Sequence, residues 1–421
     1  MLQVLKTSWA LLLGMLLLMV GNGLQGTLLG VRGAIEGFST FEISIVMSAY
    51  FAGFFGGSRL TPKLIRRVGH VRVFAALGSF ISAALILFPI IAEPWAWTIL
   101  RMILGFCFSG VYVTAESWLN NAASNENRGQ ALSLYMIVQM LGIVSAQGLL
   151  VLGDPSGFVL FIIPSVLVSI AFAPILLSIS PTPAFDSAKP MSLKELYRVS
   201  PLGCVGMFFM GGVFSAQFGM AAVYGTQAGL SIGEISTFVA SIYVGALVMQ
   251  YPVGWLSDRM DRRLLIMVVA ALAGSASVAG IVLANSYTTI LIVAFLVGGT
   301  SNPLYSLLIA YTNDFLEHED MAAASGGLIF INGMGAIAGP LITGWIMGTV
   351  GPGGFWLFIC VLMFLTAGYA AYRMTQRPAT PVNESTAYVG VSPAGSVVAL
   401  EAAQEWAIET AQDAESETTD A

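Results

Sequence analysis

Long hydrophobic runs separated by short polar stretches dominate this chain. Twelve of them reach the ~20 residues that an α-helix needs to cross ~30 Å of hydrocarbon. The predicted spans are residues 8–31, 40–61, 72–92, 95–116, 129–152, 157–179, 201–224, 234–256, 264–284, 288–311, 321–348 and 353–373. The pattern therefore predicts an all-α membrane protein whose even number of crossings places both termini on one side.

The hydrophobic pattern also repeats itself. The string GFSTFEIS (Gly37 to Ser44) recurs 192 residues later as GLSIGEIS (Gly229 to Ser236), and the same offset pairs Gln25 with Gln217. Both strings contain Ser-x-x-Glu, the capping-box pattern of a helix start. A repeat of this kind is typical of transporters, in which two similar units move around a central binding site.

The repeat and the loops predict the organisation of the chain. We expect a first six-helix half at residues 1–180, a cytoplasmic loop between the halves at 181–200, and a second six-helix half at 201–374. Within the loop, Ser192 and Glu195 predict a short surface helix. Glycine-rich stretches, Gly53 to Gly57 and Gly335 to Gly339, predict places where two helices approach closely.

Composition and charge exclude a soluble domain and indicate an orientation. Hydrophobic residues make up 57% of the chain and charged residues only 10%, with a mean hydropathy of +0.82, whereas soluble domains carry roughly 25% charged residues. Of the 17 Lys and Arg, 15 fall in segments on the side of the termini. Basic residues favour the cytoplasmic side, so we predict a multi-pass protein with a cytoplasmic N-terminus and C-terminus.

The last part of the chain differs from the rest. Residues 375–421 contain eight acidic residues and one Arg, which gives that segment a net charge of −7 within a chain total of −6. The segment is rich in small and polar residues, so we expect an acidic, mostly disordered and solvated cytoplasmic tail. Val397 to Glu409 could form a short amphipathic helix within it, and the alternative to a solvated tail is that this part is a docking element.

One loop motif carries a family resemblance. GWLSDRMDRR (Gly254 to Arg263) resembles the cytoplasmic loop motif of the major facilitator superfamily, and AESWLNNAASNENRGQALSLYMIV (Ala115 to Val138) is similar to its bacterial YcaD-like subgroup. The resemblance implies twelve helices in two pseudo-symmetric halves, alternating access, and a bacterial inner membrane. It also implies that Asp258, Arg259 and Arg262 act at the cytoplasmic gate.

The first half departs from this motif. Its copy reads PKLIRRVGHVR, and the repeat places Arg66 where Asp258 stands in the second half. A gate in this half would then need an acidic partner, for which Glu116 is the candidate. The alternative is that Glu116 is a solvated charge at a helix end.

Polar residues within the spans give the candidate binding residues, because such residues are costly in a membrane and usually face an interior or a cavity. In the resembled fold the first, fourth, seventh and tenth helices line the central cavity. The candidates on these helices are Asn22, Gln25, Arg32, Arg101, Tyr112, Gln217, Tyr224 and Asn302. Their alternative role is hydrogen bonding between helices. For Arg101, the alternatives are binding of an anionic group, an internal counter-charge, and a side chain that extends to the membrane surface.

These features predict a secondary active or facilitative transporter of a small organic solute. Because the spans have no central carboxylate, a neutral or anionic solute is favoured. A non-transporting receptor or scaffold and a polytopic membrane enzyme are the alternatives, although the chain has no P-loop motif and we expect no enzymatic activity. The expected partners are the solute and the lipid bilayer. We expect no nucleic acid, no cofactor, no metal, and a functional monomer.

Overall fold

The computed structural model describes residues 2–122, 128–177, 191–283, 286–378, 381 and 385–406. The long helices are α1 (Leu2–Ile35), α2 (Thr40–Val68), α3 (His70–Leu87), α4 (Pro94–Ala122), α5 (Arg128–Leu150), α6 (Val159–Leu177), α8 (Pro201–Gln227), α9 (Ile232–Ser257), α10 (Arg262–Val282), α11 (Tyr287–Asn313), α12 (His318–Val350) and α13 (Gly354–Met374). A short helix, α7 (Leu193–Val199), precedes α8. Each of the twelve predicted spans corresponds to one long helix.

Hydropathy agrees with this assignment. Among the described residues, eleven helices are long and apolar enough to cross a membrane, and α6 adds a shorter apolar stretch at Val159–Pro174. Helices satisfy their own backbone hydrogen bonds, which a bilayer requires of any spanning segment. The prediction of an all-α protein with twelve membrane helices is confirmed.

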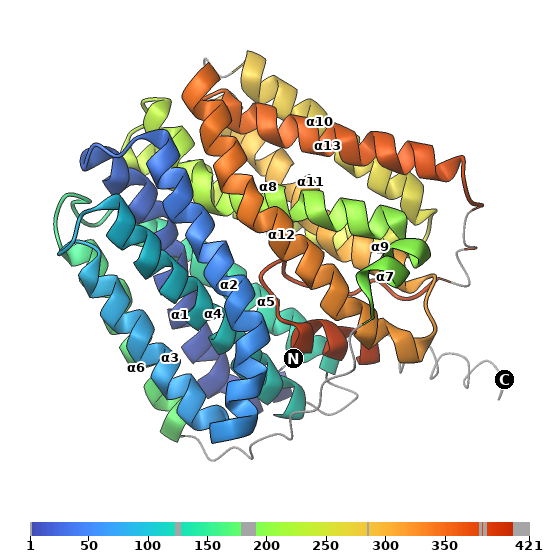
Figure 1. Ribbon diagram of the computed structural model, residues 1–421, viewed down its shortest axis with the longest axis horizontal. Coiled ribbons are helices and arrows are strands. Elements are labelled where there is room, and N and C mark those ends of the chain that lie inside the picture. The colour runs from blue at the N-terminus through green and yellow to red at the C-terminus, as the bar shows by residue number, and fades with distance from the viewer. Residues whose placement is uncertain are drawn as a thin grey trace.

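The two halves have the same internal packing (Figure 1). In the first half, α1 packs against α5 and α6, α2 packs on α4, and α3 contacts α4 and α6. In the second half, the corresponding pairs are α8 with α12 and α13, α9 with α11, and α10 with α11 and α13. The contacts between halves are also symmetric, because α2 packs on α12 and α5 packs on α9.

Paired glycines explain the tightest of these contacts. A Cβ atom on Gly53 of α2 would lie 1.9 Å from the Met102 carbonyl oxygen in α4. At the repeat-related position in α9, a Cβ on Gly245 would lie 2.1 Å from the Phe295 carbonyl oxygen in α11. The helices can therefore approach this closely only where the side chain is absent. Gly335 also abuts the backbone of α8, so the predicted role of the glycine-rich stretches is confirmed.

The turns that begin each repeat are alike as well. Gly37 and Gly229 have φ angles of 80° and 74°, a conformation that glycine adopts easily. Ser39 and Ser231 then form complete capping boxes with Glu42 and Glu234 at the starts of α2 and α9. The sequence repeat is thus a structural repeat at this turn.

The halves contact each other on the side of the membrane away from the termini, which we call the distal side. The side on which α1 begins is called the proximal side. On the distal side, Ser48 of α2 donates a 2.6 Å hydrogen bond to the Ile337 carbonyl oxygen of α12. Gly30 of α1 faces Ala222 of α8, where an added Cβ would lie 2.8 Å from that side chain. The distal side is therefore closed.

The tail differs from its prediction. Residues 385–406, which we call the C-terminal segment, lie between the two halves on the proximal side and include a helix at 397–406 (Figure 1). Leu400 is only 1% exposed. For these described residues the expectation of a solvated tail is wrong, because their alanine, valine and leucine side chains form an apolar face that packs into the molecule. Residues 407–421 lie outside the described residues.

Candidate substrate cavity

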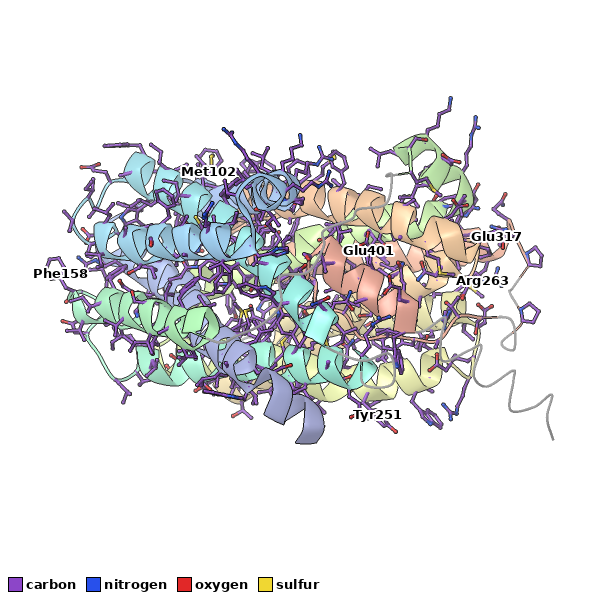
Figure 2. The ribbon with its side chains drawn as sticks, turned by 90° about the horizontal axis from the view of Figure 1, so that it is seen from below. Met102, Phe158, Tyr251, Arg263, Glu317 and Glu401 are labelled. Carbon is purple, nitrogen blue, oxygen red and sulfur yellow. The ribbon has the colours of Figure 1, made fainter. Side chains whose placement is uncertain are left out.

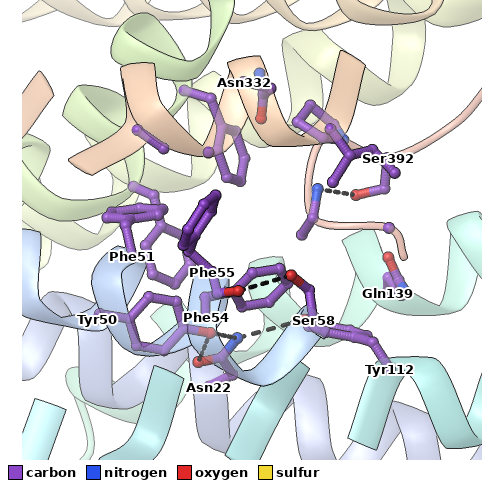
Figure 3. Close-up of a pocket in the computed structure, with 18 of the residues that line it drawn as sticks. Asn22, Tyr50, Phe51, Phe54, Phe55, Ser58, Tyr112, Gln139, Asn332 and Ser392 are labelled. Carbon is purple, nitrogen blue, oxygen red and sulfur yellow. Dashed lines mark hydrogen bonds between the residues drawn. The ribbon is translucent and has the colours of Figure 1, made fainter. Parts of the chain in front are cut away.

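A cavity between the halves lies next to the C-terminal segment. It leaves about 60 Å³ of free space for the centres of water molecules. Its walls come from α1, α2, α4, α5, α8, α9, α12 and the C-terminal segment (Figure 3). The lining residues are Asn22, Tyr50, Phe51, Phe54, Phe55, Ser58, Tyr112, Gln139, Met140, Ile143, Phe214, Phe218, Tyr243, Ile329, Asn332, Gly333, Ala336, Ser392, Pro393, Ala394 and Gly395.

A cluster of hydrogen-bonding groups forms one wall. The Asn22 amide nitrogen donates to the Tyr50 hydroxyl at 3.2 Å and to the Tyr112 hydroxyl at 3.4 Å (Figure 3). Gln25 donates to the Asn22 side-chain oxygen at 3.0 Å. All of these side chains are buried. The cluster therefore gives a solute both donors and acceptors at a fixed position in the cavity wall.

Aromatic rings adjoin this cluster and connect the halves. Phe51 of α2 lies 6.3 Å from Phe214 and 6.0 Å from Phe218 of α8, both in edge-to-face contact. Tyr50 lies 5.5 Å from Phe218. Stacked and edge-to-face geometries are both favourable for aromatic rings. A flat, partly apolar solute could therefore contact these rings in either geometry.

Arg101 lies behind this cavity rather than in its lining. Its guanidinium donates to the Gln25 side-chain oxygen at 2.6 Å and lies 4.6 Å from the centre of the Tyr50 ring. A further contact reaches the Met47 sulfur at 3.2 Å, while the Nε atom has no partner. Arg101 is 0% exposed, so it does not extend to the membrane surface, and that alternative is wrong.

Two candidates in the second half form a similar hydrogen-bonded contact between helices. Gln217 of α8 donates to Ser301 of α11 at 2.7 Å and accepts from Asn302 at 3.1 Å. The repeat-related glutamines, Gln25 and Gln217, therefore each join the first helix of their half to the fourth. Neither belongs to the lining of the cavity.

Two further candidates lie away from the cavity. Arg32 forms an ion pair with Glu36 at 2.6 Å and donates to the Pro155 carbonyl oxygen at 2.9 Å, at the distal end of α1. Tyr224 packs in an aromatic cluster with Phe355, at a ring distance of 5.2 Å, and with Trp356. Of the eight binding candidates, Asn22 and Tyr112 are the two that line the cavity.

The loop motif of the second half holds three helix ends together. Arg262, 4% exposed, forms ion pairs with Asp314 at the end of α11 and, at 3.4 Å, with Asp258 at the end of α9. Burial raises the pKa of Asp314, and the charge of Arg262 opposes that rise. Arg259 instead lies over the Trp255 ring at 4.4 Å on the exposed face. Arg262 is thus the central cation of this junction.

Glu116 has a different environment from the one expected for a helix-end charge. It is 2% exposed and accepts hydrogen bonds from the Tyr135 hydroxyl at 3.0 Å and from the Ser396 backbone amide at 2.9 Å. The alternative of a solvated charge is therefore wrong. The Arg66 side chain is exposed, and its pairing with Glu116 stays a prediction.

Sequence reasoning missed most of the cavity wall. On α2, Tyr50 lies one helical turn before Phe54, and Phe51 lies one turn before Phe55. On α8, Phe214 and Phe218 are also one turn apart. Such aromatic stripes could have been found from spacing alone, but they look the same when a helix faces lipid. The contribution of residues 392–395 had no sequence signal, because the tail was expected in solvent.

Comparison with known proteins identifies similar proteins in bacteria. An uncharacterized MFS-type transporter, YcaD, from Escherichia coli is 26% identical over 360 residues, which covers 84% of this chain and 92% of that protein. The YcaD protein of Salmonella arizonae is 24% identical over 359 residues, with the same coverage. The predicted similarity to the YcaD-like subgroup is confirmed.

Solved structures show the same fold. A mutant of the nucleoside transporter NupG has a TM-score of 0.74 at 15% identity and covers 87% of this chain and 99% of its own. A bacterial homologue of the human lysosomal transporter Spinster has a TM-score of 0.68 at 14% identity, over 97% and 98% of the two chains. The profile of the Major Facilitator Superfamily matches residues 11–241 and 202–404. With twelve membrane helices in two similarly packed halves, this chain belongs to the Major Facilitator Superfamily of membrane transporters.

Proposed function

We propose that this protein transports a small, neutral and partly apolar organic solute by alternating access between its halves, as a secondary active or facilitative carrier. The observation that carries the proposal is the composition of the cavity wall. Aromatic rings and amides line it, and no charged side chain is among the lining residues that the structure describes. Pockets of this kind bind solutes through apolar contact with a few polar groups that fix orientation.

The position of Arg101 supports one of the two solute classes that the sequence favours. The Tyr50 ring lies beside the guanidinium at 4.6 Å and itself lines the cavity, whereas Arg101 does not. An anionic solute would therefore meet the ring and the Asn22 amide before the charge. This arrangement favours a neutral solute over an anionic one in the state described.

The family and the charge distribution support the setting of this activity. The relatives are bacterial transporters, and the basic loops lie on the proximal side, as the distribution of basic residues predicts for the cytoplasmic side. We propose a monomer in the bacterial inner membrane with both termini in the cytoplasm, so that the proximal side is cytoplasmic. We also propose that the chain has no enzymatic activity.

Thermal unfolding of purified protein with a solute panel tests the solute class. The panel comprises neutral aromatic and heterocyclic compounds, including nucleosides, together with organic anions and cations. A ligand at 100 times its Kd should stabilise the folded state by ~2.7 kcal/mol. We expect stabilisation by neutral solutes. Stabilisation by anions alone or by cations alone would contradict the proposal.

Two buried amides provide a matched pair of variants for this test. Asn22 lines the cavity, whereas Asn302 is buried in the α8–α11 contact. Asn22→Ala should abolish the stabilisation by the solute, and Asn302→Ala should retain it. Uptake of the stabilising solute into proteoliposomes then separates a carrier from a receptor, because a receptor would bind the solute without moving it.

A further inference from the structure

The C-terminal segment forms part of the cavity wall itself. Ser392, Pro393, Ala394 and Gly395 line the cavity, and Figure 3 shows this loop between α12 and α5. The loop therefore occupies the proximal mouth through which a solute would enter or leave. Little free space remains behind it, at about 60 Å³ for water centres.

The first part of the segment binds the second half of the protein. Its backbone amides donate to polar side chains of α9 and α11 and of the residues that end these helices. Thr386, Tyr388 and Val391 donate to Asp314, Asp258 and Ser306, respectively, at 2.9 Å each. Two of these acceptors are the carboxylates that also pair with Arg262. The junction around Arg262 therefore holds the C-terminal segment as well as the helix ends.

The later part of the segment also binds the first half, in addition to hydrogen bonds between Gln404 and the second half. The Ser396 amide donates to the buried carboxylate of Glu116 in α4 at 2.9 Å. Glu405 forms an ion pair with Arg128 at the start of α5 at 3.0 Å. The segment thus crosses from one half to the other and has polar anchors on both.

The helix at residues 397–406 fills the space between these anchors. Leu400, Ala402 and Ala403 are at most 2% exposed. In Figure 2 the helix that carries Glu401 lies between the helices of the two halves. An α-helix with its side chains is about 10 Å wide, so the halves cannot close the proximal side while this helix occupies the space between them.

We propose that residues 385–406 are an autoinhibitory plug that blocks the cavity and holds the halves apart on the proximal side. The inhibitory role rests on the proposed transport function, because alternating access requires the halves to approach each other on that side. Release of the plug opens the cavity to solute and allows the halves to rock. The plug and a solute compete for the same volume.

A cysteine reporter tests whether the plug covers the cavity. Ser58 lines the cavity, and the three native cysteines are buried, so Ser58→Cys provides a site for a water-soluble maleimide in purified protein. Leu400→Asp should release the plug, because docking would bury an unpaired charge. Leu400→Met is the matched control, since it conserves volume and apolarity.

We expect Leu400→Asp and a chain ending at residue 384 to label at least about tenfold faster than the parent, a factor equivalent to 1.4 kcal/mol. Leu400→Met should label at the parent rate. Equal labelling of all four proteins would overturn the proposal. If Leu400→Asp fails to elute as a folded monomer, the chain ending at residue 384 decides by the same criterion.

Solute flux separates this proposal from the proposed function. If Leu400→Asp and the chain ending at residue 384 show both faster labelling and faster uptake than the parent, the plug and the transport function are both supported. Faster labelling with no uptake of any solute supports coverage of the cavity by the plug but contradicts transport. Uptake by the parent that neither release variant increases, with unchanged labelling, overturns the plug and retains the transporter.

Discussion

Arg101 is a fully buried charge whose contacts all lie within the protein, which predicts a structural role. Its hydrogen bond to Gln25 joins α4 to α1, and its guanidinium supports the Tyr50 ring of the cavity wall. Arg101→Ala leaves the Gln25 oxygen without this donor, so we expect a loss of about 1–3 kcal/mol in the free energy of unfolding. Thermal unfolding measures the loss. Arg72 is exposed, so Arg72→Ala should change stability little.

Stabilisation by a solute shows whether Arg101 is instead a binding residue. If Arg101→Ala kept the stability of the parent but lost stabilisation by an organic anion, Arg101 would be a binding residue. Sequence alone could not decide between these roles, because a buried arginine in a span indicates a polar partner without naming it. Asn22 and Tyr112 could be predicted to face the cavity, but Tyr50 and its phenylalanine neighbours could not be distinguished from lipid-facing aromatics.

At the scale of the element, helix starts were the most predictable feature, because a capping box is a local hydrogen-bond pattern within four residues. The boxes at Ser39 and Ser231 are complete, and Ser192 caps α7 by accepting from the Glu195 amide. Packing between elements was less predictable. The position of the C-terminal segment depends on distant groups, such as Glu116 and Asp314, that its own composition does not reveal.

The junction of α9, α10 and α11 allows a comparison of two arginines in one loop. Arg262→Ala would leave Asp314, which is 3% exposed, as a buried carboxylate without its cation. Breaking such a pair costs about 3–5 kcal/mol. Arg259→Ala removes an exposed contact, which contributes about 0.5–1 kcal/mol. We expect a large drop in thermal stability for Arg262→Ala and a small one for Arg259→Ala. Equal effects would show that Arg262 is not the central cation of the junction.

At the scale of the whole molecule, the duplicated halves explain why the fold was predictable and the functional state was not. Twelve apolar runs and one repeat are sufficient to predict the number of helices and the symmetric packing of α1 to α6 and of α8 to α13. The closed distal side, by contrast, depends on contacts such as Ser48 to Ile337, between residues 289 positions apart in the chain. Under the proposed alternating access the same helices also form a second state, and a few contacts of this kind would set the balance between the two states.

A pair of glycines on α12 tests that balance. A Cβ on Gly344 would lie 2.3 Å from the Ser44 Cβ of α2, whereas a Cβ on Gly348, one turn later, meets nothing within 4 Å. Both valine substitutions change the same helix, so their intrinsic effects on helicity are equal. Gly344→Val should force α2 and α12 apart and open the distal side, as measured by faster maleimide labelling of Ser48→Cys; Gly348→Val should not.

The same comparison connects the distal contact to the plug. A docked C-terminal segment holds the proximal side open, and a carrier that opens at both ends would leak, so the segment should oppose distal opening. The increase in Ser48→Cys labelling caused by Gly344→Val should therefore be larger in the chain ending at residue 384 than in the full chain. An excess of 1.4 kcal/mol in this double-mutant cycle corresponds to about tenfold. Strictly additive effects would mean that the segment and the distal contact act on separate equilibria.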